Sequence, residues 1–414
     1  MSQSSHPAKT ATGKASLPSV AAARAMMLAH ARALGAEPVS LAQGLGRVLA
    51  ENIVATRDQP PFAVSAMDGY ALSSADAPGI LSVAGESAAG RGFEGRVERG
   101  QAIRISTGAA MPDGADTVVI QEDVQRSGDG VVVPAVAAGK NIRPRGGDFK
   151  TGALLLPAGR RLDGVTLSLI AATGAAAFQA ARAPRIAILS SGDELAVPGT
   201  APGKFQIFDS ATFGIAALVQ SWGGHPLRLA VEKDDAQAIA RAAEQGLKDS
   251  DLLVVIGGAS VGDHDHARPA LKKLGLELAV EKIAVRPGKP TWFGTTPQGK
   301  VLGLPGNPAS ALVCAALFLR PLIEAMLGRD PQSCVAMRRA HLLQALPANG
   351  PREHYLRARL DSDGQGRLTA RAFEDQDSSL ISVFSAANAL IRLPAGAPAA
   401  TAGTIVDVLP LEGF

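Results

Sequence analysis

The second half of the chain alternates continuous apolar runs with segments of helical periodicity. The apolar runs are RIAILSSG, PLRLAVEKDD, DLLVVIGG and KVLGLPG, which begin at Arg185, Pro226, Asp251 and Lys300. Apolar positions recur at helical spacing between these runs, over residues 211–222, 236–247, 267–274 and 307–326. Strands that are apolar on both faces and that alternate with helices predict a doubly wound α/β domain, which we place at residues 183–331.

The flanking segments have other textures. Helical patterns run from Ser19 to Leu49, with Ser40 as the predicted N-cap of a second helix, and return from Asp148 to Ala181. Short β-rich runs separated by Gly, Pro and Asp lie between them, and a pattern typical of short β-strands reappears after Arg329. We therefore predict an elongated helical domain, a β domain inserted into it and a C-terminal β domain. Their bounds are 1–54 with 150–182 (1–17 being a polar, mobile tail), 55–149 and 332–414.

Composition narrows the class of protein. The chain has 414 residues, a net charge of +3 and 4% aromatic residues, which argues against a nucleic-acid partner. Cys314 and Cys334 are too few for a disulfide framework or a cysteine metal cluster. The N-terminus lacks the apolar core of a signal peptide, and the longest uncharged run, 164–181, is too weakly apolar for a membrane span. We therefore expect a cytoplasmic protein with no membrane partner.

Two loops at predicted strand ends have the composition of phosphate-binding loops. In LPGNPAS, Asn307 is the predicted N-cap and Pro308 the first helical residue, so free N–H groups would face an anion. The glycines of GGASVGD allow close approach of a phosphate to the backbone. An ordinary capped helix is the competing interpretation of either loop alone, whereas two loops at one sheet edge favour a ligand. The candidate residues are Gly257, Gly258, Ser260, Gly262, Pro305, Gly306 and Asn307.

Carboxylates recur at the same strand ends. Oxygen ligands beside phosphate loops suit Mg²⁺, which is often shared between one or two carboxylates and substrate phosphates. Helix N-caps and solvated turns are the competing interpretation for part of the set. The carboxylates are Asp193, Glu194, Asp234, Asp235, Asp263 and Asp265.

Charged and imidazole groups complete the candidates. The turn VRPGKP presents Arg286 and Lys289, which could bind an anion or lie in solvent. His264 and His266 alternate with aspartates, but a zinc or iron site would need more converging histidine or cysteine ligands. We therefore expect these histidines at a helix start rather than on a transition metal.

Taken together, these segments resemble the MoeA family of molybdopterin molybdenumtransferases, which includes the E domain of gephyrin. The resemblance runs from about Ser19 to the C-terminus. It rests on motifs in a fixed order: SAMDGYA, RISTGAAMP with GADTVV, NIRPRGGDF, ILSSGDEL, GGASVGD, RPGKP, LPGNPAS and the late segment SSLISVFSAANALI.

The resemblance implies a fold and a reaction. The implied fold is multidomain α/β plus β: a MogA-like doubly wound domain, an elongated helical domain with a β insertion, and a C-terminal β domain. Family members insert molybdenum from molybdate into adenylylated molybdopterin with Mg²⁺ and release AMP. They are homodimers whose active site lies between the α/β domain of one subunit and the β insertion of the other. A MogA-like adenylyltransferase and molybdenum-cofactor enzymes are the implied transfer partners.

Site residues carry over motif by motif. The inserted domain would contribute Asp68, Thr107 and Asp148 to catalysis. The α/β domain would contribute Glu194, Asp234 and Asp265, which would also hold the metal. Cofactor-binding residues outside the glycine loops would be Lys282, Arg286, Lys289, Ser378 and Ser379.

The sequence departs from the family pattern in two motifs. Ala63 and Val64 stand where an Asp-Asn pair is common, and Arg286 stands where lysine is common, which changes reach and donor geometry. Two other functions are kept as alternatives. One is a non-catalytic dimeric scaffold of the same fold, and the other is a CinA-like nucleotide pyrophosphatase, against which the motifs of the first 150 residues argue.

Overall fold

The computed structural model describes residues 17–257 and 266–411, which form two compact units. Unit 1 holds the chain up to Glu37, the segment Gly46–Ala50 and everything from Ala180 onward, and unit 2 holds Pro38–Leu45 and Glu51–Gln179. Strands β1 (Ala36–Ser40) and β12 (Ala177–Ala181) contain two of the points at which the chain passes from one unit to the other. The predicted N-terminal tail lies outside the described residues except for Leu17.

A six-stranded mixed sheet is the centre of the α/β part of unit 1. Its order is β16–β13–β17–β21–β20–β18. The first four strands are parallel, as predicted, whereas β20 and β18 add an antiparallel edge that the sequence did not predict. Only residues 297–298 separate β20 from β21, too few for the crossover that a parallel pair needs. The strands are β13 (Arg185–Ser190), β16 (His225–Arg228), β17 (Leu252–Ile256), β18 (Glu277–Val280), β20 (Trp292–Thr296) and β21 (Gly299–Leu304).

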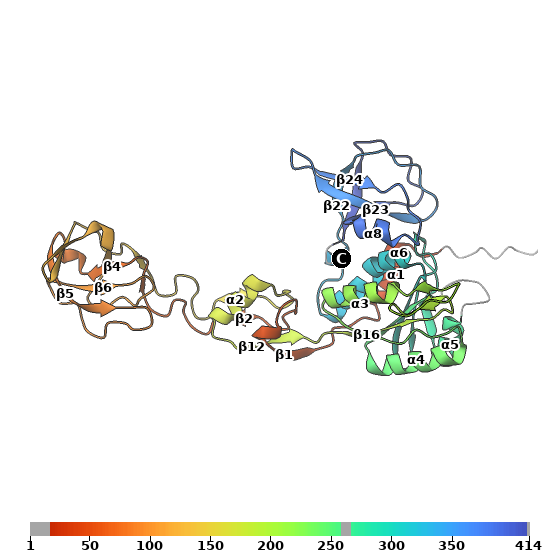
Figure 1. The fold of residues 1–414 in the computed structure, drawn as a ribbon, viewed down its shortest axis with the longest axis horizontal. Helices are drawn as coiled ribbons and strands as arrows, with labels where there is room; N and C mark the ends of the chain where they lie inside the picture. The colour runs from red at the N-terminus through yellow and green to blue at the C-terminus, as the bar shows by residue number, and fades with distance from the viewer. Residues whose placement is uncertain (1–16, 258–265, 412–414) are drawn as a thin grey trace, which may run out of the picture. The chain divides into compact units, whose positions relative to one another are not determined.

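Helices cover both faces of this sheet (Figure 1). Along β17, Leu252, Val254 and Ile256 belong to one hydrophobic cluster, while Leu253 and Val255 belong to the other, because successive side chains of a strand point to opposite faces. This double burial explains why the strand is apolar throughout. Helices α1 (Val20–Leu28), α3 (Ala211–Ser221), α6 (Pro308–Cys314) and α7 (Arg320–Met326) contribute to the first cluster, and α4 (Ala236–Asp249) and α5 (Ala267–Lys273) to the second.

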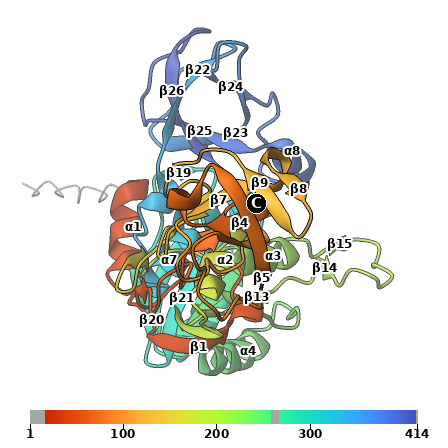
Figure 2. The ribbon, with the colours of Figure 1, turned by 90° about the vertical axis from the view of Figure 1, so that its left-hand side faces the viewer.

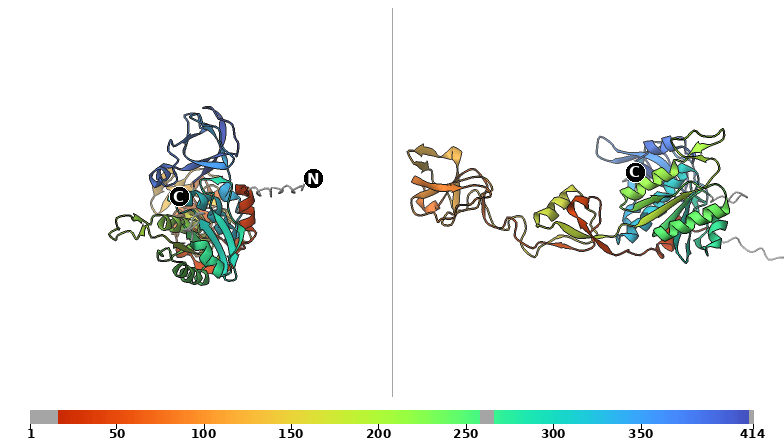
Figure 3. Two further views of the ribbon diagram at one scale, coloured as in Figure 1. Left: turned by 90° about the vertical axis from the view of Figure 1, so that its right-hand side faces the viewer. Right: turned by 60° about the horizontal axis from the view of Figure 1, so that its bottom comes forward.

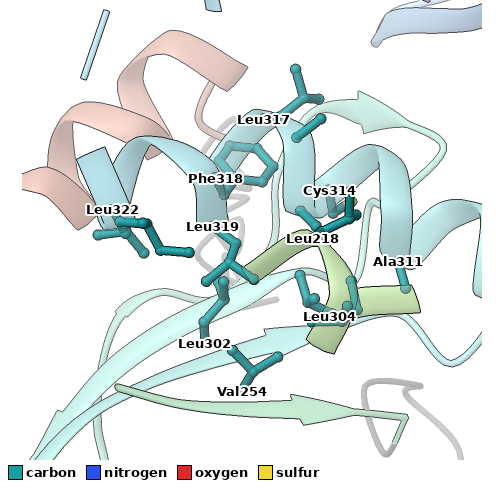
Figure 4. Packing of buried hydrophobic residues seen from close by; sticks show 14 of the residues in the cluster. Leu218, Val254, Leu302, Leu304, Ala311, Cys314, Leu317, Phe318, Leu319 and Leu322 are labelled. Carbon is teal, nitrogen blue, oxygen red and sulfur yellow. The ribbon is translucent and has the colours of Figure 1, made fainter. Parts of the chain in front are cut away.

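A long apolar helix runs from Pro308 to Met326 and includes a π-helical segment at Ala315–Leu319. Its side chains pack against Val254, Leu302 and Leu304 of the sheet (Figure 4). By length and composition alone it could cross a membrane, but 83% of its most apolar window is buried inside the structure, as in the core helix of a globular domain.

The C-terminal part of unit 1 is a small β barrel that lies beside the α/β part (Figure 3). Its strands pair in the order β23–β24–β22–β26–β25, and β25 pairs back onto β23 to close the barrel. The two-residue strand β19 (Val285–Arg286), from the α/β part, pairs in parallel with β23. The barrel elements are β22 (Arg338–Leu342), β23 (Glu353–Ser362), β24 (Leu368–Ala372), α8 (Ile381–Ala386), β25 (Ala389–Leu393) and β26 (Ile405–Pro410).

Unit 2 contains a six-stranded sheet in the order β7–β4–β6–β5–β9–β8 and one helix, α2 (Gly164–Ala172). A capping box between Asp163 and Thr166 begins this helix. The sheet strands are β4 (Gly69–Leu72), β5 (Gly79–Ser87), β6 (Gln101–Ile105), β7 (Thr117–Ile120), β8 (Gln125–Ser127) and β9 (Gly130–Val133). Two further pairs are β3 (Val64–Ser65) with β10 (Ile142–Arg143), and β2 (Ile53–Val54) with β11 (Leu154–Leu156).

Two helical predictions need correction. The helix predicted after Ser40 is only a 3-10 turn at Leu41–Gln43, because Gly44 follows it and Gly46 adopts φ +75°. The pattern over 164–181 contains α2 only as far as Ala172. Gly174, at φ +87°, ends the helix, and the rest of the segment enters β12.

Candidate active site

A cleft of about 1320 Å³ opens in unit 1 at the carboxyl ends of the parallel strands. This is the edge at which open α/β sheets bind ligands. Many of the predicted site residues line it, namely Glu194, Asp234, Gly257, Lys282, Arg286, Lys289, Pro305, Gly306, Asn307, Ser378 and Ser379.

The backbones of neighbouring strand ends approach one another closely in this cleft. Gly257 has φ +89°, and a Cβ there would lie 3.2 Å from the carbonyl oxygen of Ser191. A Cβ on Gly306 would lie 3.4 Å from the Cα of Gly257. Glycine at both positions therefore lets adjacent strand ends approach closely, and both glycines line the cleft, where their backbone can face a phosphate.

Asn307 occupies the predicted N-cap position of α6, and Pro308 follows it in the first turn. Its side chain makes no capping hydrogen bond, but its Nδ2 donates to Ser378 Oγ over 2.6 Å. The carboxylate of Asp377 accepts from Ser379 Oγ and from the Ser379 backbone N–H, and these bonds lower the pKa of Asp377. The late serine segment thus contacts the loop LPGNPAS of the α/β part through Asn307.

The buried Arg357 is hydrogen-bonded to both ends of this serine segment. Its Nε donates to Gln376 Oε1 over 3.3 Å, and its Nη1 donates to the Leu380 carbonyl over 3.1 Å. Burial is the main reason why the pKa of Arg357 is lowered. These bonds hold both ends of the segment, so the serines are presented from a fixed loop.

The carboxylates of the acidic strand ends have separate tasks. Asp235 caps α4, since its side chain accepts from the Ala238 backbone N–H over 2.7 Å. Asp193, Glu194 and Asp234 line the cleft instead. Within residues 17–257 and 266–411, no group of three or more His, Cys, Asp or Glu side chains is arranged to hold a metal ion.

The turn that contains Arg286 and Lys289 is joined to the barrel by backbone pairing. Strand β19 pairs Arg286 with His354 of β23, and the Glu353 backbone N–H donates to the Ala284 carbonyl over 3.0 Å. The turn closes on itself through a bond from the Ile283 backbone N–H to the Lys289 carbonyl over 3.1 Å. Arg286 and Lys289 therefore line the cleft from a braced loop.

The barrel adds further cleft residues that the sequence did not single out, among them Arg352 and His354. His354 is only 9% exposed. Burial, together with the charges of Arg286, Arg352 and Arg357, lowers its pKa to about 4. The imidazole is therefore neutral at neutral pH, and the arginines and lysines carry the positive charge of this wall.

The lowered pKa of His354 predicts a loss of stability in acid. The unfolded chain binds a proton near pH 6.5 and the folded chain only near 4, so stability falls as the pH drops through that window, by about 3 kcal/mol at most. We expect His354→Gln to remove this loss, with little difference from wild type at pH 7.5. Urea unfolding midpoints of both proteins at pH 7.5 and 4.5 measure this stability difference. If the midpoints of the two proteins differ by the same amount at both pH values, the prediction is contradicted.

Three predicted catalytic residues belong to unit 2. The carboxylate of Asp68 accepts from the Thr107 backbone N–H over 2.6 Å and from Thr107 Oγ1 over 2.9 Å, and these bonds lower its pKa. Asp148 lies in another turn, where its backbone N–H donates to the Gln59 carbonyl over 2.9 Å, and its side chain is exposed. Asp68 and Thr107 thus form one pair of exposed polar side chains.

Most of the predicted phosphate loop GGASVGD lies outside the described residues. This concerns Gly258, Ser260, Gly262 and Asp265, together with Asp263 and His264. The described start of α5 has His266 at its N-cap position, with no side-chain capping bond.

The thiols offer no nucleophile at neutral pH. Cys314 is buried and accepts a hydrogen bond from Thr291 Oγ1 over 3.2 Å. Burial raises the pKa of Cys314 to about 12 and that of Cys334 to about 11, so both stay protonated.

Three family models match the chain. They are described as the MoeA N-terminal region (domain I and II) over residues 18–174, a probable molybdopterin binding domain over residues 187–325, and the MoeA C-terminal region (domain IV) over residues 339–411.

Curated relatives and solved structures agree with these matches. The molybdopterin molybdenumtransferase of a Nostoc species is 34% identical over 91% of this chain and 88% of its own. That of Haemophilus influenzae is 33% identical over 91% of this chain and 94% of its own. A crystal structure of a molybdopterin biosynthesis MoeA protein from Pyrococcus horikoshii has a TM-score of 0.82 and 28% identity, covering 96% of this chain and 100% of that one.

Proposed function

The chain belongs to the MoeA family, and from that premise we propose that it inserts molybdenum from molybdate into adenylylated molybdopterin and releases AMP. One observation carries the proposal. A single cleft combines open glycine backbone, carboxylates and a braced cationic turn, which together suit a substrate containing a phosphoanhydride.

Each wall of the cleft has a task in the proposed reaction. The main chain at Gly257 and Gly306 approaches the pyrophosphate, as open glycine backbone allows. Lys282, Arg286 and Lys289 attract the anionic pterin phosphate or molybdate, and positive charge near the phosphoanhydride stabilises the departing AMP. Delivery of molybdate to the dithiolene is coupled to cleavage of that anhydride, so no protein nucleophile is needed.

We propose Mg²⁺ as the metal cofactor of this reaction. Glu194 and Asp234 line the cleft with Asp193, but among the described residues no three such side chains are arranged around one metal position. Such an open set fits Mg²⁺, which binds through one or two carboxylates and completes its shell with substrate phosphates and water. When bound, the ion would neutralise charge on the phosphoanhydride. Asp265 is a third proposed ligand.

The remaining roles are proposals from the family resemblance. Asp68, Thr107 and Asp148 would act in catalysis from unit 2, and the protein would be a cytoplasmic homodimer. A MogA-like adenylyltransferase would supply the substrate, and molybdenum-cofactor enzymes would receive the product. Light scattering of the purified chain tests the dimer.

Reconstitution tests the function directly. Purified protein with adenylylated molybdopterin is expected to release AMP and form active cofactor only when molybdate and Mg²⁺ are both present. AMP release that does not depend on molybdate would instead indicate a nucleotide pyrophosphatase. Absence of both products would favour a scaffold.

A further inference from the structure

A short two-stranded arm of unit 1 exposes large apolar side chains. Its strands are β14 (Leu195–Ala196) and β15 (Ile207–Phe208), and it projects from the rest of the unit (Figure 2). Phe205 is 84% exposed, Ile207 62% and Phe208 47%. Such a group of exposed apolar side chains marks a contact surface more often than isolated ones do.

Only part of this arm faces the cleft. Leu195, Ile207 and Phe208 line it, whereas Phe205 is not among its lining residues. The Ile207 backbone N–H donates to the Glu194 carbonyl over 2.7 Å, so the apolar pair is one strand away from the residue proposed to bind Mg²⁺, and all three residues line the cleft. The cleft therefore has an apolar part next to its anion-binding part.

The arm is held firmly at its base. Gln206 Nε2 donates to the Asp193 carbonyl over 3.1 Å, and the Asp209 backbone N–H donates to the Ala196 carbonyl over 2.9 Å. The buried Asp209 in turn accepts from the backbone N–H of Thr212 over 3.2 Å and from its hydroxyl, at the start of α3. The backbone on the Asp209 side of Phe208 is thus held before a ligand arrives, which lowers the entropic cost of ordering the arm on binding.

We propose that Ile207 and Phe208 form the face on which a planar, bicyclic nitrogen heterocycle of the substrate packs. The proposal rests on the proposed function for the identity of the substrate, whose adenine and pterin rings share this chemistry. Aromatic side chains bind such rings by stacking, and the pyrophosphate that is linked to the ring through the rest of the substrate would lie toward Glu194 and the cations. A cleft of about 1320 Å³ exceeds the usual range for a small ligand and has room for both parts.

Binding of AMP and of inorganic pyrophosphate separates the two parts of the cleft. Calorimetry is expected to show AMP binding about tenfold more weakly to Phe208→Ala, the size of one lost stacking contact, with pyrophosphate unchanged. Phe205→Ala, on the same arm but outside the cleft, should bind both like wild type. In Phe208→Trp, AMP should quench the new indole fluorescence and pyrophosphate should not.

The outcomes also identify the ring. Weaker AMP binding assigns the face to adenine. Unchanged AMP binding with a KM for adenylylated molybdopterin about tenfold higher assigns it to the pterin. The proposal is overturned if Phe208→Ala changes neither the AMP affinity nor the KM for adenylylated molybdopterin, or if Phe205→Ala changes these two quantities equally. It is also overturned if the wild type binds neither AMP nor pyrophosphate. Loss of AMP affinity in a protein that shows no molybdate-dependent turnover would sustain this inference while refuting the proposed function.

Discussion

Replacing Glu194 by glutamine is expected to lower molybdate-dependent AMP release at least about a hundredfold, since one preorganised electrostatic group contributes on that order. Glu194 lines the cleft beside the glycine strand ends. Glutamine keeps the size and the carbonyl oxygen but removes the negative charge that would hold a divalent cation on the substrate phosphates. The rate should therefore recover in part at higher Mg²⁺ concentration. Initial rates over a Mg²⁺ titration measure both effects.

Glu244→Gln is the matched control. Glu244 lies exposed on α4, and it is not among the residues of the cleft. The same chemical change there should leave the rate and its Mg²⁺ dependence at wild-type values. A Glu194→Gln protein that works near the wild-type rate would show that this carboxylate is not a ligand in the reaction.

Replacing Gly288 by alanine is expected to destabilise unit 1 by about 3 kcal/mol, the sum of a positive-φ cost and an overpacking cost. Gly288 has φ +109°, and a Cβ there would collide with Cys314 Sγ in the buried core. The turn would have to lift, and Arg286 and Lys289 would move with it. We therefore expect weaker binding of pyrophosphate as well as a lower urea midpoint.

Two further variants separate the causes. Gly364→Ala is the control, since Gly364 has open space around its Cα and no positive φ. In Gly288→Ala combined with Cys314→Ala, the sulfur is gone, so the double variant should lose less stability than the two single losses added together. Simple additivity would show that the collision with Cys314 is not the cause.

The α/β core was largely predictable from the sequence. Strands buried on both faces must be apolar throughout, and the run Leu252–Ile256 alternates between two hydrophobic clusters for that reason. The turn residues Asn307 and Pro308 likewise predicted the start of α6 correctly. The helix expected after Ser40 was wrong, since apolar spacing over a few residues could not outweigh the glycines at 44 and 46.

The cleft was predictable only in part. Motif and strand-end arguments selected residues that the fold gathers there, and their roles stay proposals. Arg352, His354 and Phe208 carried no signal of their own, because basic residues at the start of a strand and an aromatic residue on a short exposed strand are common on any surface.

The sequence by itself determined where the parallel strands lie, which loops end them and which family the motifs resemble, because these depend on local periodicity and turn chemistry. Only the tertiary structure decided which residues of the C-terminal barrel contact those loops. The pairing of β19 with β23 brings His354 level with Arg286, and the bond between Asn307 and Ser378 joins segments 71 residues apart. Such contacts follow from how the barrel packs on the α/β part, and no local pattern in the chain encodes them.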